Sequence, residues 1–115
     1  MHWFSQEKQW INRQHLDVCR VPAPTFLEQP RAEWIAERFA ELGWQSKIDK
    51  AGNAIAVADR RSNGPLIALT AHLDTVLAPR SPEDIRVDGD GRFLGPGVAD
   101  NGSGLAALLA FARLL

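Results

Sequence analysis

The sequence has little cysteine and no excess of one charge, and both absences exclude classes of protein. Cys19 is the only cysteine among 115 residues, so neither an internal disulfide nor a cysteine-based zinc site can form. The chain has 13 basic and 14 acidic side chains, which gives a formal net charge of -1. This balance argues against a basic surface for nucleic acid or for a membrane. We therefore expect no nucleic-acid partner and no membrane partner.

Targeting signals and membrane-spanning runs are also missing. Residues 1–8 lack the charged-then-apolar order of a signal peptide. The apolar run at the C-terminus is too short to cross a bilayer, so the cytoplasm is the expected location. Hydrophobic residues make up 45% of the chain and charged residues 23%, which is ordinary for a soluble globular protein.

The glycine patterns that hold phosphate or calcium are absent. A G-x-G-x-x-G loop would need glycine where Asp100 stands, and no Gly-Lys-Ser/Thr occurs, which disfavours a nucleotide-binding domain. Residues 88–91, Asp-Gly-Asp-Gly, lack the rest of a calcium loop and its closing glutamate. We expect a hairpin turn there.

Apolar periodicity and turn residues predict helices and strands in a definite order. Helical spacing covers residues 3–19, about 30–42, and about 102–115. Strands are expected at 44–49 and 54–59, and a second hairpin at 85–87 and 92–94. Pro30 suits a first helical turn, and Gly43 is well placed as a C-terminal cap.

The apolar run at residues 66–70 predicts a strand buried on both faces. Open α/β sheets usually place ligand sites at the carboxyl ends of such strands. Helices flanking strands indicate an α/β layer fold. We expect residues 1–115 to be a single, truncated domain whose sheet edges and apolar faces stay uncovered.

Three side chains near the end of that run indicate a cation site. His72 and Asp74 are two residues apart, so in an extended chain they point to the same face. A metal-binding histidine usually donates its second ring N–H to a carboxylate or carbonyl. From the residues alone, His72 binds a cation, Asp74 orients His72, and Asp100 is a second ligand. The alternatives are a hydrogen-bonded core histidine and capping or turn carboxylates. His2 and His15 have no partner pattern, and we expect them to be solvated or helix-surface residues.

These motifs resemble the zinc-dependent exopeptidase and deacylase family related to glutamate carboxypeptidase, succinyl-diaminopimelate desuccinylase and acetylornithine deacetylase, peptidase family M20. That family has His-x-Asp at a strand end and then a Gly-x-Gly-x-x-Asp loop. Here His72 and Asp74 match the first motif, and Gly95, Gly97 and Asp100 match the second. The opening segment, residues 20–25, also looks like the family's.

The sequence departs from the family at two places. Pro96 stands where many members have arginine, and Gly102-Ser103-Gly104 follows Asn101 where many have Lys-Gly. Asp-Asn-x-Ser-Gly is closer to the loop of related zinc aminopeptidases.

The resemblance implies the N-terminal half of a three-layer αβα catalytic domain with a mixed sheet. It implies that Asp100 bridges two Zn²⁺ ions, that His72 binds one of them, and that Asp74 is the catalytic carboxylate that orients His72. Co²⁺ or Mn²⁺ are alternative metals. A cis peptide bond is expected after Asp100. The implied function is hydrolysis of a peptide or N-acyl amide bond by a zinc-activated water.

The family's general base is the first of two adjacent glutamates, and no Glu-Glu pair occurs in this sequence. We therefore expect residues 1–115 alone to be inactive and to need a missing C-terminal half. The expected substrate is a small peptide or an N-acyl amino acid, and a homo-oligomer is left open. The alternative function is a non-catalytic binding or interaction module of the same ancestry.

Overall fold

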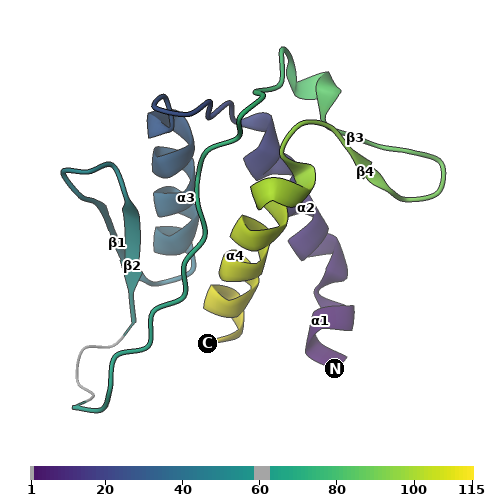
Figure 1. Ribbon diagram of the computed structural model, residues 1–115. Helices are drawn as coiled ribbons and strands as arrows, with labels where there is room; N and C mark the ends of the chain where they lie inside the picture. The colour runs from purple at the N-terminus through teal and green to yellow at the C-terminus, as the bar shows by residue number, and fades with distance from the viewer. Residues whose placement is uncertain (1, 59–62) are drawn as a thin grey trace.

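The computed structural model describes residues 2–58 and 63–115, which form helices and two small antiparallel sheets (Figure 1). The helices are α1 (His2–Gln6), α2 (Lys8–Arg20), α3 (Gln29–Glu41) and α4 (Gly104–Leu114), with short helical turns η1 (Pro82–Asp84) and η2 (Val98–Ser103). The strands are β1 (Gln45–Ile48), β2 (Ala54–Val57), β3 (Arg86–Val87) and β4 (Phe93–Leu94). The predicted α/β class is confirmed.

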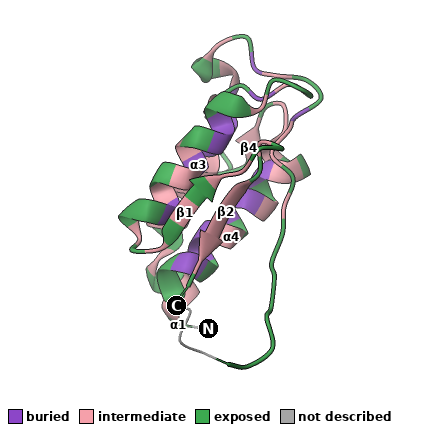
Figure 2. Ribbon diagram, turned by 90° about the vertical axis from the view of Figure 1, so that its left-hand side faces the viewer, coloured by how far each residue is buried: buried purple, intermediate pink, exposed green. Residues whose placement is uncertain are grey.

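The core lies where α2, α3 and α4 meet, and Figure 2 shows the buried stripes on α3 and α4. Ile35 and Phe39 are one turn apart on α3, so both point to the same side of that helix. They pack with Leu105 and Leu109 of α4. Burying a large aliphatic side chain stabilises a fold by about 1.5–3 kcal/mol. This cluster therefore fixes α3 relative to α4.

The β1–β2 hairpin packs against α3, and its register pairs Gln45 with Val57 and Ile48 with Ala54. The Ser46 hydroxyl donates a hydrogen bond of 2.7 Å to the carbonyl of Ala36 on α3. The predicted strands at 44–49 and 54–59 are thus confirmed with shorter ends; residue 59 lies outside the described residues. The predicted hairpin around residues 88–91 is confirmed by β3 and β4.

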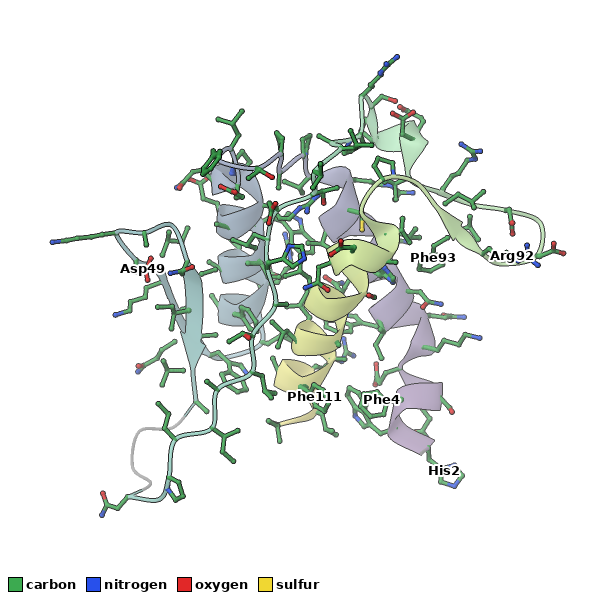
Figure 3. All side chains as sticks on the ribbon, viewed as in Figure 1. His2, Phe4, Asp49, Arg92, Phe93 and Phe111 are labelled. Atoms are coloured by element: carbon green, nitrogen blue, oxygen red, sulfur yellow. The ribbon has the colours of Figure 1, made fainter. Side chains whose placement is uncertain are left out.

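The single helix predicted at residues 3–19 is interrupted at Glu7, so that prediction was wrong in part. Glu7 leaves the helical region at φ -95 and ψ 9. Contacts with α4 flank the break. The rings of Phe4 and Phe111 meet edge to face with centroids 6.2 Å apart, and Arg113 pairs with Glu7 at 3.0 Å. Figure 3 shows the side chains of Phe4 and Phe111 near each other. The apolar period continues through the break because both helices face α4.

The strand predicted at residues 66–70 is wrong. This segment is extended but unpaired, and Leu66 and Ile67 are 92% and 83% exposed. Figure 2 shows it standing clear of the helices and of β2. A strand requires a neighbour for its backbone N–H and C=O groups. Within residues 2–58 and 63–115, no backbone hydrogen bond links residues 66–70 to another segment. None of the helices described is long and apolar enough to cross a bilayer.

Candidate metal site

The site begins where the extended segment reaches the helices, at residues 72–75. The amide of Thr75 donates a 2.8 Å hydrogen bond to the carbonyl of Ala23, in the proline-flanked turn before α3. Alternate residues of this segment point in opposite directions. Thr75 is 4% exposed and faces inward, whereas His72 and Asp74 face outward together.

The side chains of His72 and Asp74 are in contact, as their spacing predicts. The Nδ1 atom of His72 lies 3.1 Å from Oδ1 of Asp74. The other carboxylate oxygen of Asp74 accepts a 2.7 Å hydrogen bond from the hydroxyl of Thr25. This bond, followed by the one with His72, lowers the pKa of Asp74 from its ordinary value. Asp74 is therefore held as a carboxylate in a fixed position beside the ring.

Asp100 reaches the same imidazole from η2, the kinked turn before α4. Its backbone is not helical, with φ -113 and ψ 94, and the peptide bond to Asn101 is cis, as the resemblance implies. Oδ1 of Asp100 lies 2.7 Å from Nε2 of His72. In this arrangement Asp100 does not cap α4, whose first turn has no side-chain cap hydrogen bond.

Contacts from α2 hold the loop that carries Asp100. Nε2 of His15 lies 2.6 Å from the carbonyl of Val98, and its ring meets the edge of Phe93 at 5.0 Å. The thiol of Cys19, 1% exposed, donates a 3.8 Å hydrogen bond to the carbonyl of Gly97. Burial raises the pKa of this thiol, which keeps it protonated. His15 was predicted to be a solvated or helix-surface residue without a partner; it is half-buried on α2 and has a partner, because α2 packs this face against the loop.

The imidazole of His72 stands between two acceptors. An ionised carboxylate oxygen can only accept, so the imidazole bonds both carboxylates at once only when each ring nitrogen carries a proton. The hydrogen bond to Asp100, and then the one to Asp74, raise the pKa of His72 above its ordinary value. The side chains of His72 and Asp100 are 51% and 87% exposed. The pair is thus open to an incoming ion.

The chemistry of this cluster fits part of a zinc site. Imidazole nitrogen and carboxylate oxygen are both zinc ligands, and Asp74 occupies the position from which a carboxylate orients a ligating histidine. In the described residues, no group of three or more His, Cys, Asp or Glu side chains is arranged to hold a metal ion. His72 and Asp100 are therefore two candidate ligands, with Asp74 on the far side of the ring from Asp100.

Two residues of the site were missed by sequence reasoning. Thr25 belongs to the opening segment that resembles the family, but its sequence context does not indicate that it bonds Asp74. Arg31, on α3, is 1% exposed and donates a 2.7 Å hydrogen bond to the carbonyl of Leu73. An arginine in a helix rich in charged residues is normally solvated, and no sequence signal marks this one as buried.

Known proteins are similar to this chain over the segment that carries the candidate site. The model of peptidase family M28 matches residues 53–115, more than half of the chain, and this range contains His72, Asp74 and Asp100. A LysW-lysine hydrolase of Deinococcus radiodurans is 37% identical over 93 residues, covering 78% of this chain and 24% of that protein. A protein of Pyrococcus abyssi, provisionally named a LysW-lysine/LysW-ornithine hydrolase, is 37% identical over 93 residues, covering 81% and 26%.

A third relative has a different named substrate. The cytosol non-specific dipeptidase of Escherichia coli is 32% identical over 111 residues, covering 81% of this chain and 22% of the dipeptidase. The chain thus spans about a quarter of the length of the curated relatives that it matches. Because the family model covers most of the chain, including the three residues of the site, this chain belongs to peptidase family M28.

Proposed function

We propose that this chain is the N-terminal part of a zinc-dependent hydrolase that cleaves a peptide or N-acyl amide bond. The observation that carries the proposal is the convergence of His72 and Asp100, whose facing atoms are 2.7 Å apart. The names of the relatives, two LysW-amino-acid hydrolases and a dipeptidase, support an amide substrate. The assignment to family M20 stays a prediction, since the family model that matches is that of M28.

The residues of this chain would hold and orient the metal. Asp74 keeps the proton of His72 on Nδ1, so the lone pair of Nε2 is free for the ion once the second proton leaves. Thr25 fixes Asp74 in turn, through the bond of 2.7 Å. Asp100 would supply its carboxylate to the same metal centre. Bound zinc supplies Lewis acidity toward the scissile carbonyl and lowers the pKa of a bound water.

A cleft beside the site has room for a small substrate. Its volume is about 580 Å³, and His72 and Asp74 form part of its wall. Apolar side chains such as Phe26 and Leu108 line it together with Lys50. Pockets of this size hold small ligands, with a few polar groups that set their orientation. We propose that a small peptide or N-acyl amino acid binds at this cleft.

The general base is not among these residues in our proposal. Water activation requires a carboxylate that accepts the proton, whereas Asp74 is occupied by His72 and Thr25. We propose that the base and the remaining ligands come from the rest of the full-length protein, and that residues 1–115 alone do not turn over substrate. Zinc-dependent turnover by the isolated chain, abolished by His72→Ala, would contradict this.

The metal assignment is tested by calorimetric zinc titration of the chain. We expect wild type to bind zinc and His72→Ala and Asp100→Ala to lose binding. Asp90→Ala is the matched control, because Asp90 is an exposed aspartate in the β3–β4 turn. It should bind like wild type. Equal affinity in wild type and Asp100→Ala, or no binding by wild type, contradicts the assignment.

A further inference from the structure

Arg31 is a buried charged residue that the proposed chemistry does not use. It is 1% exposed, and burial lowers the pKa of its guanidinium. Burying a charge is unfavourable unless its donors are satisfied. Its donors reach neutral oxygens: Nε bonds the carbonyl of Val21 at 2.9 Å, and Nη2 bonds that of Cys19 at 3.5 Å. These two bonds attach the guanidinium to the end of α2.

The remaining nitrogen, Nη1, bonds the site segment itself. It donates a hydrogen bond of 2.7 Å to the carbonyl of Leu73, the residue between His72 and Asp74. It donates a second hydrogen bond, of 2.8 Å, to the hydroxyl of Thr75. A guanidinium offers its donors in a fixed planar fork. The bonds of Arg31 to Leu73 and Thr75 therefore set the position of this segment relative to α2 and α3.

Thr75 passes this constraint to the loop that carries Asp100. A Cβ added to Gly97 would lie 2.4 Å from the hydroxyl oxygen of Thr75, so the backbone of Gly97 packs directly on that side chain. Gly97 has φ +76, which side chains rarely adopt. The amide of Gly102 then bonds the carbonyl of Gly97 at 2.8 Å. The loop that carries Asp100 therefore packs on the side chain of Thr75 through Gly97.

We propose that Arg31 is a positioning residue that sets the distance between His72 and Asp100 through Leu73, Thr75 and Gly97. It touches neither ligand, and it acts by holding the two segments that carry them. The effect of Arg31 on zinc affinity rests on the proposed function. Its effect on the position of residues 73–75 does not depend on a bound metal.

Two measurements on the full 115-residue chain test it. The first is zinc affinity by calorimetry. The second is hydrogen exchange of the Thr75 amide, compared with that of Leu109 in the α4 core. For Arg31→Met we expect at least about a tenfold loss of zinc affinity, as when a partner of a ligand is removed. We also expect Thr75 exchange to accelerate about tenfold or more while Leu109 exchange changes less.

The matched control is Ile35→Val, on the same helix and in the same core. It loosens packing but leaves the hydrogen bonds of Arg31 to Leu73 and Thr75 in place. It should leave zinc affinity and the Thr75-to-Leu109 exchange ratio unchanged. If Ile35→Val lowers zinc affinity as much as Arg31→Met does, or if Arg31→Met leaves both measurements as in wild type, the proposal is overturned.

If Arg31→Met does not fold, a second pair of variants at Thr75 tests the positioning role. Thr75→Val removes only the hydroxyl that Arg31 bonds, and Thr75→Ser restores it. We expect Thr75→Val to lose about tenfold in zinc affinity and Thr75→Ser to recover most of it; equal values for both overturn the proposal. If wild type binds no zinc, the proposed function fails. The exchange ratio of Thr75 then decides the positioning role by itself.

Discussion

Nε2 of His72 lies 2.7 Å from Oδ1 of Asp100, although 28 residues separate them in the sequence. The segment of His72 is fixed by the turn before α3, through the bond from Thr75 to Ala23. The segment of Asp100 is fixed by α2, through His15 and Cys19. The packing of the helices therefore sets the distance between His72 and Asp100.

Removing the carboxylate of Asp74 is expected to weaken zinc binding without unfolding the chain. In Asp74→Asn the side chain keeps its shape but no longer holds the imidazole of His72 as a charged acceptor. Loss of such a partner costs about 10–100-fold in metal affinity. Calorimetric titration measures this, with circular dichroism to confirm the helices. Asp90→Asn in the exposed turn is the control, and an unchanged affinity in Asp74→Asn would rule out the orienting role.

Gly97→Ala is expected to destabilise the chain, whereas Gly89→Ala should not. Gly97 has φ +76, and a Cβ there would meet the Thr75 side chain at 2.4 Å; a Cβ at Gly89 has nothing within 4 Å. A strained backbone of this kind costs about 1–3 kcal/mol, and the clash adds to it. Urea unfolding measures the free energies. Equal stability of the two variants would show that the loop is not seated on Thr75.

Asp49 makes the stability of the β1–β2 hairpin depend on pH. Its carboxylate, labelled in Figure 3, accepts bonds of 3.0 Å and 2.8 Å from the amides of Ala51 and Asn53. The Asn53 side chain first, and then these amides, lower the pKa of Asp49. A lowered folded-state pKa contributes stability that is present above the unfolded value, about 3.9, and is lost as pH falls through the folded value.

The expected result is that wild type is more stable than Asp49→Ala at pH 7, and that the difference shrinks below about pH 4. Thermal melting across this range measures it. A control is Gly89→Ala, which changes no titratable group and whose added Cβ meets nothing within 4 Å; its difference from wild type should not narrow in the same window. A constant difference between wild type and Asp49→Ala down to pH 2 would refute the linkage.

The exposed segment at residues 66–70 should tolerate charge. Leu66 is 92% exposed, so Leu66→Lys is expected to change the free energy of unfolding by less than about 0.5 kcal/mol. Leu105, 2% exposed in the core, is the contrast: Leu105→Ala should cost about 2–5 kcal/mol. Urea unfolding at low protein concentration compares them. A large loss in Leu66→Lys would mean that this segment is packed in solution.

The sequence predicts the helices well because their signals are local. Pro30, Gly43 and the apolar spacing of Ile35 and Phe39 specify α3 within one residue at each end. Gln45 to Val57 form the expected hairpin, and a turn in which the amide of Gly52 bonds the carbonyl of Asp49 closes it. Such features depend on hydrogen bonds between near neighbours, so a short stretch of sequence determines them.

The segment at residues 66–70 shows where local signals are not enough. Its composition predicts a strand, yet strand formation needs a neighbour with free backbone groups, and the described residues place none beside Leu66 or Ile67. The break at Glu7 is also not visible in the local sequence. Phe4 contacts Phe111 and Glu7 pairs with Arg113 of α4, so tertiary contacts accompany the break although the apolar period continues.

The sequence by itself determined the contact between His72 and Asp74, because an alternating backbone puts residues two apart on one face. Only the tertiary structure decided that Asp100 meets the other side of the imidazole, and that the buried Arg31 bonds the carbonyl of Leu73. Those contacts span 28 and 42 residues, respectively. Closing such loops is unfavourable in chain entropy, so the packing of α2, α3 and α4 must hold them closed.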